Sequence, residues 1–308
     1  MIAVVGGRGV IGSAIVEALR ARRSDVIVIT HDREHANLPG VRYGDLLIPE
    51  TLGPALEGAE VVIQSANFVT YPIEKPGRRH TFMDFDGFGT ERLVAAAETH
   101  GVRRYIYISG VGVRADSPRA YYRAIWHGEQ AVLNSRLEAV CIRPTLVYGP
   151  QDRGLNRVLR AARVSPVIPV VGDGKQLHQP VYVQDVAEVV RRATDAGAPQ
   201  GVFEVGGPDR MSLDKMLHLL FQLAGLRRKI VHIPSALARL GGTVCQNLPN
   251  PPLTVAAVDF LTENFVADLG PLLRAFNLKT TPFEEGLRMS LACRKMSLDH
   301  AGDPEQGA

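Results

Sequence analysis

The sequence has few cysteines, few aromatic residues and no long uninterrupted apolar segment. Its three cysteines, Cys141, Cys245 and Cys293, are far apart, which excludes a disulfide scaffold and a cysteine zinc site and fits a reducing compartment. The longest stretch without a charged residue, 240–258, is interrupted by glycines and three prolines and therefore predicts no membrane-spanning helix. Only five residues precede the first glycine, too few for a signal peptide. We expect a cytoplasmic protein without a transmembrane segment.

A strong excess of charge of either sign is also missing. The chain has 35 Lys and Arg against 32 Asp and Glu, and a formal net charge of +3 gives no reason to expect nucleic-acid binding. With 45% apolar residues, the 308-residue chain is not globally disordered. Its length allows a sizeable core, in one large domain or two smaller ones.

Short apolar runs alternate with amphipathic segments through the first half of the chain. Continuous runs rich in β-branched residues are typical of strands buried on both faces of a parallel sheet, and the helices between them form right-handed crossovers. This pattern predicts an α/β fold with a doubly wound parallel sheet, the Rossmann fold. The expected strands are 2–5, 26–29, 61–63, 105–108 and 139–142, and the expected helices are 11–19, 90–100 and 122–134.

After Pro150 the chain becomes rich in proline and its segments become shorter. We therefore predict a Rossmann domain over 1–150 and a smaller C-terminal substrate lobe over 151–293, from which elements such as 202–205 return to the main sheet. Ser212 is the expected N-cap of a helix over 213–224. The polar segment 294–308 is expected to be a disordered tail.

Glycine is the plentiful residue, and four of the 30 glycines, at positions 6, 7, 9 and 12, lie where the first strand turns into the start of the first helix. In this setting a G-x-G-x-x-G pattern allows a sharp turn, a close approach of the backbone to a pyrophosphate and close packing of the helix, whose N-terminus favours the anion. The same residues are also compatible with a tight turn that binds nothing. The loop residues expected to bind a dinucleotide are Gly6, Arg8, Gly9, Val10, Ile11 and Gly12.

The end of the second strand selects between NAD and NADP. An acid there would bind the ribose 2′-hydroxyl of NAD, but Asp32 is offset from the strand end. Arg8, with His31 or Arg33, offers a pairing for a 2′-phosphate, so we favour NADP(H) over NAD(H). Arg33 is equally compatible with a solvated loop charge. His31 and His35 lack a third ligand nearby, and no metal is expected.

Several blocks in order resemble the extended and atypical short-chain dehydrogenase/reductase superfamily, which is NAD-dependent epimerase/dehydratase-like. The resemblance extends over about residues 1–290 and is greatest to the branch that contains the NAD(P)H-binding accessory subunit of respiratory complex I. The blocks are 6–12, 44–46, 58–63, 105–109, 143–150, 179–187 and 203–208.

The resemblance implies a role for further positions. Asp45 and Leu46 would lie beside the adenine, Ser65, Ala66 and Asn67 would line the cofactor cleft, and Pro144 and Thr145 would border the nicotinamide. Tyr71, His178 and Gln179 are candidates to face a substrate, although each is also compatible with a loop or core role. Asp185 and the turn 206–208 are expected to be architectural.

At the catalytic centre the chain departs from that family. Active members carry Tyr-x-x-x-Lys on a helix and a Ser or Thr after the fifth strand. Here Tyr121 takes the tyrosine position, Ile125 takes the lysine position, and Ser109 is a stand-in for the serine because Gly110 aligns nearer to it.

The missing lysine would normally lower the tyrosine pKa. A tyrosine with an ordinary pKa of about 10 is only ~0.1% ionised at pH 7, which costs a general base up to about a thousandfold in rate. Reduction, with Tyr121 as the acid, is then the easier direction. Tyr121 is equally compatible with a merely packed aromatic. Tyr122, Trp126 and Glu129 share the neighbouring helical face and are expected to serve packing and the surface, with Tyr122 as a fallback acid.

Three functions are compatible with these residues. The first is an NADP-dependent oxidoreductase that reduces a small carbonyl-like substrate, with Tyr121 and Ser109 as catalytic residues. The second is a non-catalytic NAD(P)H-binding sensor, assembly factor or accessory subunit, whose protein partner or membrane surface would contact region 240–260; that region is also compatible with a lid. Sugar-nucleotide epimerisation is disfavoured, because it relies on the intact Tyr/Lys pair. A homo-oligomer is compatible with all three.

Overall fold

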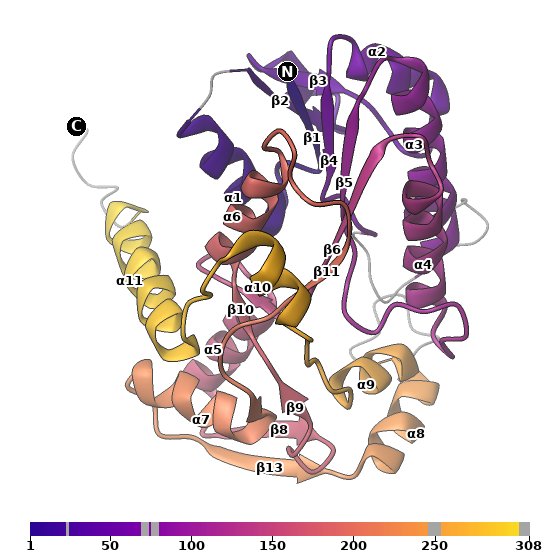
Figure 1. Cartoon of the computed structure of the whole chain (residues 1–308). Helices are drawn as coiled ribbons and strands as arrows, with labels where there is room; N and C mark the ends of the chain where they lie inside the picture. The colour runs from indigo at the N-terminus through magenta and orange to yellow at the C-terminus, as the bar shows by residue number, and fades with distance from the viewer. Residues whose placement is uncertain (23–24, 69–73, 75–79, 246–253, 302–308) are drawn as a thin grey trace, which may run out of the picture. The chain divides into compact units, whose positions relative to one another are not determined.

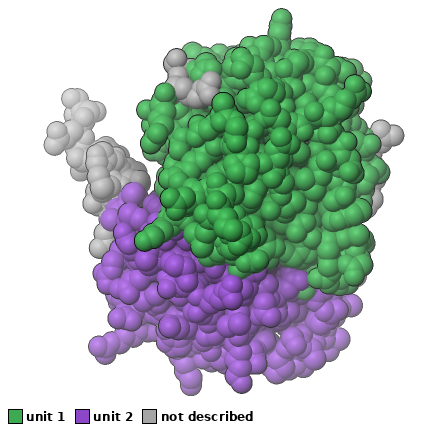
Figure 2. All heavy atoms as spheres, in the orientation of Figure 1, with its two compact units in different colours: residues 1–145, 183–205, 267–279 green, residues 146–182, 206–266, 280–308 purple. Residues whose placement is uncertain are grey.

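The structure, a computed structural model, describes residues 1–22, 25–68, 74, 80–245 and 254–301, with side chains to residue 293. The chain divides into two compact units (Figure 2). Unit 1 comprises Met1–Thr145, Val183–Val205 and Ala267–Lys279, and unit 2 comprises Leu146–Tyr182, Gly206–Val266 and Thr280–Ala308. Two segments that follow residue 150, Val183–Val205 and Ala267–Lys279, thus belong to the first unit.

Unit 1 is built on a seven-stranded sheet in which every pairing is parallel. The strand order is β11-β6-β5-β4-β1-β2-β3, so the order reverses beside β1, between its neighbours β4 and β2. In doubly wound sheets, ligands bind at such a switch point, beyond the carboxyl ends of the strands. The strands are β1 (Ile2–Val5), β2 (Val26–Thr30), β3 (Val41–Tyr43), β4 (Val61–Gln64), β5 (Arg104–Ile108), β6 (Glu138–Pro144) and β11 (Gly201–Val205).

Helices cover both faces of this sheet, as the alternating pattern predicts (Figure 1). Helices α2 (Leu52–Leu56), α3 (Phe88–Thr99) and α4 (Ala120–Leu133) form one layer, and α1 (Val10–Arg20) packs with α6 (Val183–Ala193) in the other. Helix α10 (Gly270–Phe276) packs on β11. The prediction of a doubly wound α/β fold is confirmed.

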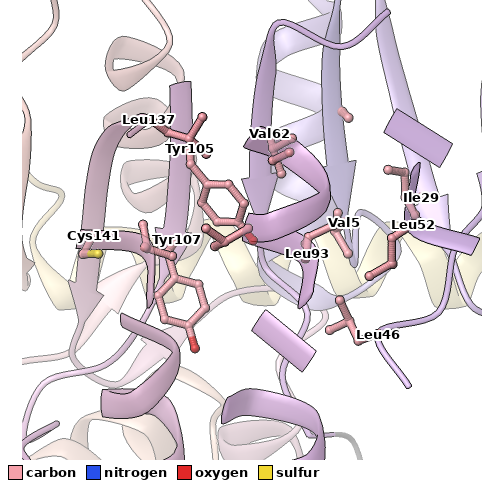
Figure 3. Close-up of a cluster of buried hydrophobic side chains, with 14 of the residues drawn as sticks. Val5, Ile29, Leu46, Leu52, Val62, Leu93, Tyr105, Tyr107, Leu137 and Cys141 are labelled. Atoms are coloured by element: carbon pink, nitrogen blue, oxygen red, sulfur yellow. The ribbon is translucent and has the colours of Figure 1, made fainter. Parts of the chain in front are cut away.

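Between the sheet and the α2–α4 layer lies a core of buried side chains, part of which Figure 3 shows. Each fully buried aliphatic or aromatic side chain contributes about 1.5–3 kcal/mol to folding. Hydrogen bonds link three polar side chains at this core: the Tyr105 hydroxyl donates to Gln64 Oε1 (2.5 Å), and Gln64 Nε2 donates to Thr90 Oγ1 (2.8 Å). Labelled members in Figure 3 include Val5, Ile29, Leu46, Val62, Leu93, Tyr105, Tyr107 and Cys141.

The described residues of unit 2 form three two-stranded sheets. Its helices are α5 (Gly154–Val164), α7 (Leu213–Leu223), α8 (Ser235–Cys245), α9 (Val255–Leu261) and α11 (Phe283–Ala301). The sheets pair β7 (Val147–Tyr148) with β10 (Val181–Tyr182), β9 (Leu177–His178) with β12 (Met211–Ser212), and β8 (Val167–Val171) with β13 (Lys229–Ile233).

Two predictions from the sequence, a helix N-cap and a disordered tail, can be compared with the structure of unit 2. Ser212 is the N-cap of α7, because its Oγ accepts a hydrogen bond from Lys215 N (3.3 Å). Helix α11 continues to Ala301, into the segment 294–308 for which disorder was expected. In the described part of the chain, no helix combines the length and the apolar character needed to cross a membrane.

Candidate dinucleotide-binding site

The chain turns directly from β1 into the glycine loop at the switch point of the sheet. Gly6 has φ +78°, a conformation that favours glycine, and its carbonyl accepts a hydrogen bond from Gly9 N (3.0 Å). Helix α1 then begins at Val10, with Gly9 as its extended N-cap. Arg8 and Gly9 are exposed, so the N–H groups at this end of α1 are open to an anion.

Packing also requires glycine at two of these positions. A Cβ on Gly6 would lie 2.6 Å from the backbone nitrogen of Ala66, and a Cβ on Gly12 would lie 2.1 Å from the Gly6 carbonyl oxygen. The loop, α1 and the end of β4 therefore approach one another more closely than any side chain allows. The sequence predicted this close approach from spacing alone.

The residues after β4 complete the inner edge of the site. Ser65 Oγ donates to the Val5 carbonyl (3.1 Å), which ties the end of β4 to the end of β1. Asn67 Oδ1 is buried and has no hydrogen-bond partner within the described residues. A buried acceptor without a donor is costly unless a ligand or water supplies one. The glycine cradle and this acceptor together fit a dinucleotide.

The end of β2 carries residues that the sequence predicts to select between NAD and NADP. Asp32 is engaged within its own turn, since its carboxylate accepts from Glu34 N (3.0 Å) and contacts His35 Nδ1. Arg33 lies over the Tyr43 ring, with its guanidinium carbon 4.4 Å from the ring centroid. His31 is exposed. The acid is thus held locally, and the cations stand at the surface.

The remaining positions assigned by resemblance differ in their environment. Asp45 Oδ1 accepts a hydrogen bond from Leu47 N (2.9 Å). The Leu46 side chain is buried in the core, so only the backbone of Leu46 offers polar groups to a ligand. At the end of β6, the Pro144 carbonyl accepts from Val111 N (3.1 Å), and Thr145 N donates to the Val205 carbonyl (2.9 Å). Pro144 and Thr145 therefore fix the loop after β5 and the edge strand β11.

Tyr121 lies in the first turn of α4 and is half-buried. Its ring packs against Phe82, with centroids 5.4 Å apart, and against Tyr122, with centroids 5.7 Å apart. Ile125, one turn further along, is 1% exposed and belongs to the hydrophobic core. The position that holds a lysine in active relatives is therefore occupied by an apolar side chain in an apolar environment.

Ser109 takes part in a buried ion-pair network. Its Oγ donates to Glu129 Oε2 (2.6 Å), and Arg143 binds the same carboxylate through Nε (3.0 Å) and Nη2 (2.5 Å). The expectation that Glu129 serves the surface is wrong: it is 0% exposed. It is buried because Arg143 on β6 and Ser109 after β5 supply the charge and the hydrogen bonds that a buried carboxylate requires.

Sequence reasoning missed a second buried acid, Asp86, on the π-helix η4 (Met83–Gly87). Its Oδ1 accepts from Phe68 N (3.0 Å), whereas Oδ2 has no partner within the described residues. Burial raises the pKa of Asp86 to about 8, although the hydrogen bond from Phe68 lowers it in part. Burial first, and then the nearby charges of Asp86 and Tyr121, raise the pKa of Tyr107. Asp86 and Tyr121 thus each lie close enough to Tyr107 to affect its hydroxyl.

The three candidates to face a substrate have different outcomes. Tyr71 lies outside the described residues. In unit 2, His178 is buried and stacks on Phe265 (centroids 5.6 Å apart), and burial lowers its pKa to about 4. Gln179 Nε2 donates to the Gly207 carbonyl (2.7 Å), which ties it to the turn that was expected to be architectural.

The parallel sheet with a glycine loop at its switch point defines a Rossmann-type dinucleotide-binding fold. The chain belongs to the NAD dependent epimerase/dehydratase family, whose model matches residues 2–206. The resemblance stated from the sequence is thereby confirmed.

Curated relatives include complex I subunits and a reductase. The chain is 31% identical over 244 residues to the mitochondrial NADH dehydrogenase [ubiquinone] 1 alpha subcomplex subunit 9 of Arabidopsis thaliana, and 30% identical to that of Mus musculus. These matches include 77% and 71% of this chain but only 61% and 59% of the relatives. A 2-alkyl-3-oxoalkanoate reductase of Stenotrophomonas maltophilia is 25% identical over 93% of this chain and 97% of its own length.

Solved structures share the fold along nearly the whole chain. The UDP-glucose 4-epimerase of Thermotoga maritima with UDP-glucose has a TM-score of 0.74 at 20% identity, and covers 96% of this chain and 99% of its own. The Thermus thermophilus UDP-glucose 4-epimerase complex with NAD has a TM-score of 0.72 at 22% identity, with 96% and 98% covered.

Proposed function

We propose that this protein binds NADPH in unit 1 and uses the bound nucleotide as a structural or sensing group, without Tyr/Lys-type dehydrogenase catalysis. The observation that carries the proposal is the environment of Ile125, which is 1% exposed and packed in the core where active relatives carry a lysine. When bound, the cofactor can supply a hydride, but Ile125 stands on α4 at the position that carries the lysine of the Tyr/Lys pair in active relatives.

The state of Ser109 supports the same proposal. A catalytic serine donates its hydroxyl proton to the substrate carbonyl, whereas the Ser109 hydroxyl donates to a buried carboxylate at 2.6 Å. A charge-assisted hydrogen bond of this kind is worth about 1.5–3 kcal/mol and would have to break before Ser109 could polarise a substrate. In the usual Ser-Tyr-Lys triad the tyrosine acts with a serine and a lysine. Here Ile125 replaces the lysine, and Ser109 is hydrogen-bonded to Glu129.

The preference for NADPH follows from the end of β2 and the glycine loop. Arg8 is exposed beside the N-terminus of α1, and Arg33 is at the surface over Tyr43. We expect both guanidinium groups to form ion pairs with the 2′-phosphate of NADPH. Asp32, which would select NAD, is engaged with His35 and Glu34 N. We expect Arg8→Ala to weaken NADPH binding about tenfold and to leave NADH binding within about twofold.

The role of accessory subunit or assembly factor has its own support. The 31% identity to a complex I subunit is higher than the identity to the reductase. In the region 240–260, residues 246–253 lie outside the described residues, but Leu240 and Val244 on α8 are 65% and 70% exposed. Exposed aliphatic side chains on one helix face fit a protein partner.

A reductase is the second candidate, and the retained Tyr121 favours it. Tyr121 keeps its place in the first turn of α4, where its hydroxyl can donate a proton in the reductive direction. The reductase relative matches nearly the whole chain. The substrate would then be a small carbonyl compound, reduced by NADPH with Tyr121 as the acid.

One experiment separates the two candidates. NADPH and NADH affinities are measured by isothermal titration calorimetry, and NADPH oxidation is followed over a panel of aldehydes, ketones and 3-oxo acids for the parent, Tyr121→Phe and Ile125→Lys. Tight NADPH binding with no turnover in the parent is the expected result. Turnover that Tyr121→Phe abolishes would overturn the non-catalytic proposal. Ile125→Met, which keeps the core filled, controls for loss of folding.

A further inference from the structure

Exposed cations gather in unit 2 on helix α5. The arginines of this helix recur at intervals of three or four residues, which places them along one exposed face, while Leu155, Leu159 and Ala162 are buried on the other. No acidic residue occurs in α5. The exposed face carries Arg153, Arg157, Arg160 and Arg163.

A second basic segment joins the first through strand pairing. Residues 153–172 and 215–258 contain no Asp or Glu, and β8 and β13 bring these two acid-free segments together, with Lys229 opposite Val167. The Arg228 guanidinium donates to the Ala162 carbonyl of α5. Arg227 and Lys229, both exposed, therefore lie beside the end of the α5 arginine face.

The ion pairs found among the described residues do not include these cations. Within the described part of the chain, none of Arg153, Arg157, Arg160, Arg163, Arg227 and Lys229 forms an ion pair with a carboxylate, whereas Arg191 and Arg192 in unit 1 share Glu188. Six unpaired cations on one surface repel one another, so the surface gains from an anionic partner. We call these six residues with Val164, Val167 and Val231 the basic patch.

Aliphatic side chains stand among the cations. Val164 is 87% exposed and follows Arg160 by four residues, so it lies at the end of the arginine face. Val167 and Val231, each 40% exposed, continue the surface along β8 and β13. Figure 1 shows these two strands side by side at the edge of unit 2.

From these observations we propose that the basic patch binds the surface of a bilayer that contains anionic phospholipids. Such a surface offers negative headgroups to the arginines and, a few ångströms deeper, hydrocarbon to the valines. A nucleic acid offers the charge but no place for Val164, and the basic patch has no aromatic ring to stack on a base. The bilayer is the partner that uses both kinds of side chain.

Vesicle flotation of the full chain tests this inference. The protein is mixed with vesicles of phosphatidylcholine and phosphatidylglycerol (3:1) or of phosphatidylcholine alone, at 50 mM and at 500 mM KCl. We expect binding only to the anionic vesicles and loss of that binding at high salt. Because each cation near an anionic surface contributes about 1 kcal/mol, R157E/R160E should bind at least ~30-fold more weakly.

Matched variants make the test specific. R22E/R136E makes the same charge change at two exposed arginines of unit 1 and should bind as the parent does. Val164→Ser should weaken binding several-fold at unchanged charge, while Leu38→Ser, at a 51% exposed leucine of unit 1, should not. Three results would overturn the proposal: no binding to anionic vesicles at 50 mM KCl, equal losses in R22E/R136E and R157E/R160E, or tighter binding to a DNA duplex than to the vesicles.

Discussion

The two units treat charge in opposite ways. Unit 1 carries 21 cations and 21 carboxylates and buries several of them, including Asp86, Arg104 and Glu129. Unit 2 carries 14 cations and 11 carboxylates, so the whole net charge of +3 belongs to it, and six of its cations lie exposed and unpaired within the described residues. Unit 2 also holds most of the large hydrophobic side chains that are exposed.

Sheet size explains this difference. A seven-stranded sheet with a helical layer on each face has an interior deep enough to surround a polar side chain with partners. Arg104 is an example: it is 1% exposed, and its guanidinium reaches Glu138 and the carbonyls of Ala193 and Ala198. Three two-stranded sheets provide much less interior, and the charged groups of unit 2 stay mainly at its surface.

The largest effect that would sharpen this comparison is expected at Asp86. Its carboxyl stays protonated to about pH 8 in the folded protein but ionises near pH 4 in the unfolded chain. The folded state therefore binds the extra proton, and the free energy of unfolding falls as pH rises from about 4 to about 8, by at most about 6 kcal/mol. Asp86→Asn should remove this loss. Urea unfolding at pH 5 and pH 9 measures it, and an unchanged pH slope would contradict the assignment.

The ion pairs of the two units give the next contrast. Removing one partner of a buried pair leaves an uncompensated charge, so Glu129→Ala should lower the free energy of unfolding by about 3–5 kcal/mol. Asp259→Ala breaks the pair with Arg239, whose side chain is 53% exposed, and should cost less than about 1 kcal/mol. Both values come from urea unfolding at pH 7. Similar losses in the two variants would remove the distinction between the units.

The parts of unit 1 that sequence alone predicted are local. The glycine loop needs only the residues from β1 to α1, and β1 spans the predicted 2–5. The burial of Glu129 depends on Arg143 from β6 and on Ser109 after β5, which only the fold brings together. Asp86 is similar: α4 approaches η4 at Gly128, where a Cβ would lie 2.5 Å from the Asp86 carbonyl oxygen. Helical periodicity cannot reveal such contacts.

Unit 2 contains a buried base, His178, whose pH effect has the opposite sign. His178 is neutral in the folded protein to about pH 4, whereas in the unfolded chain it takes up a proton below about pH 6.5. Its contribution to stability is therefore fully present above pH 6.5 and is lost as pH falls towards 4, by at most about 3 kcal/mol. His178→Phe keeps the stacking on Phe265 and should flatten that slope. A slope equal to that of the parent, measured by urea unfolding between pH 4 and 7, would argue against this role.

The smallest effect concerns a helix end in unit 2 that sequence predicted correctly. Ser212 Oγ accepts from Lys215 N at the start of α7, and loss of such a cap costs about 1 kcal/mol. Ser212→Ala should lower the free energy of unfolding by that amount, whereas Ser212→Asp should preserve it, because aspartate also caps helices. Thermal unfolding followed by circular dichroism measures both. This cap is exposed to water, whereas Glu129 is buried. If Ser212→Ala lowered the free energy of unfolding as much as Glu129→Ala does, solvent exposure would not explain why an interaction in unit 2 contributes little to stability.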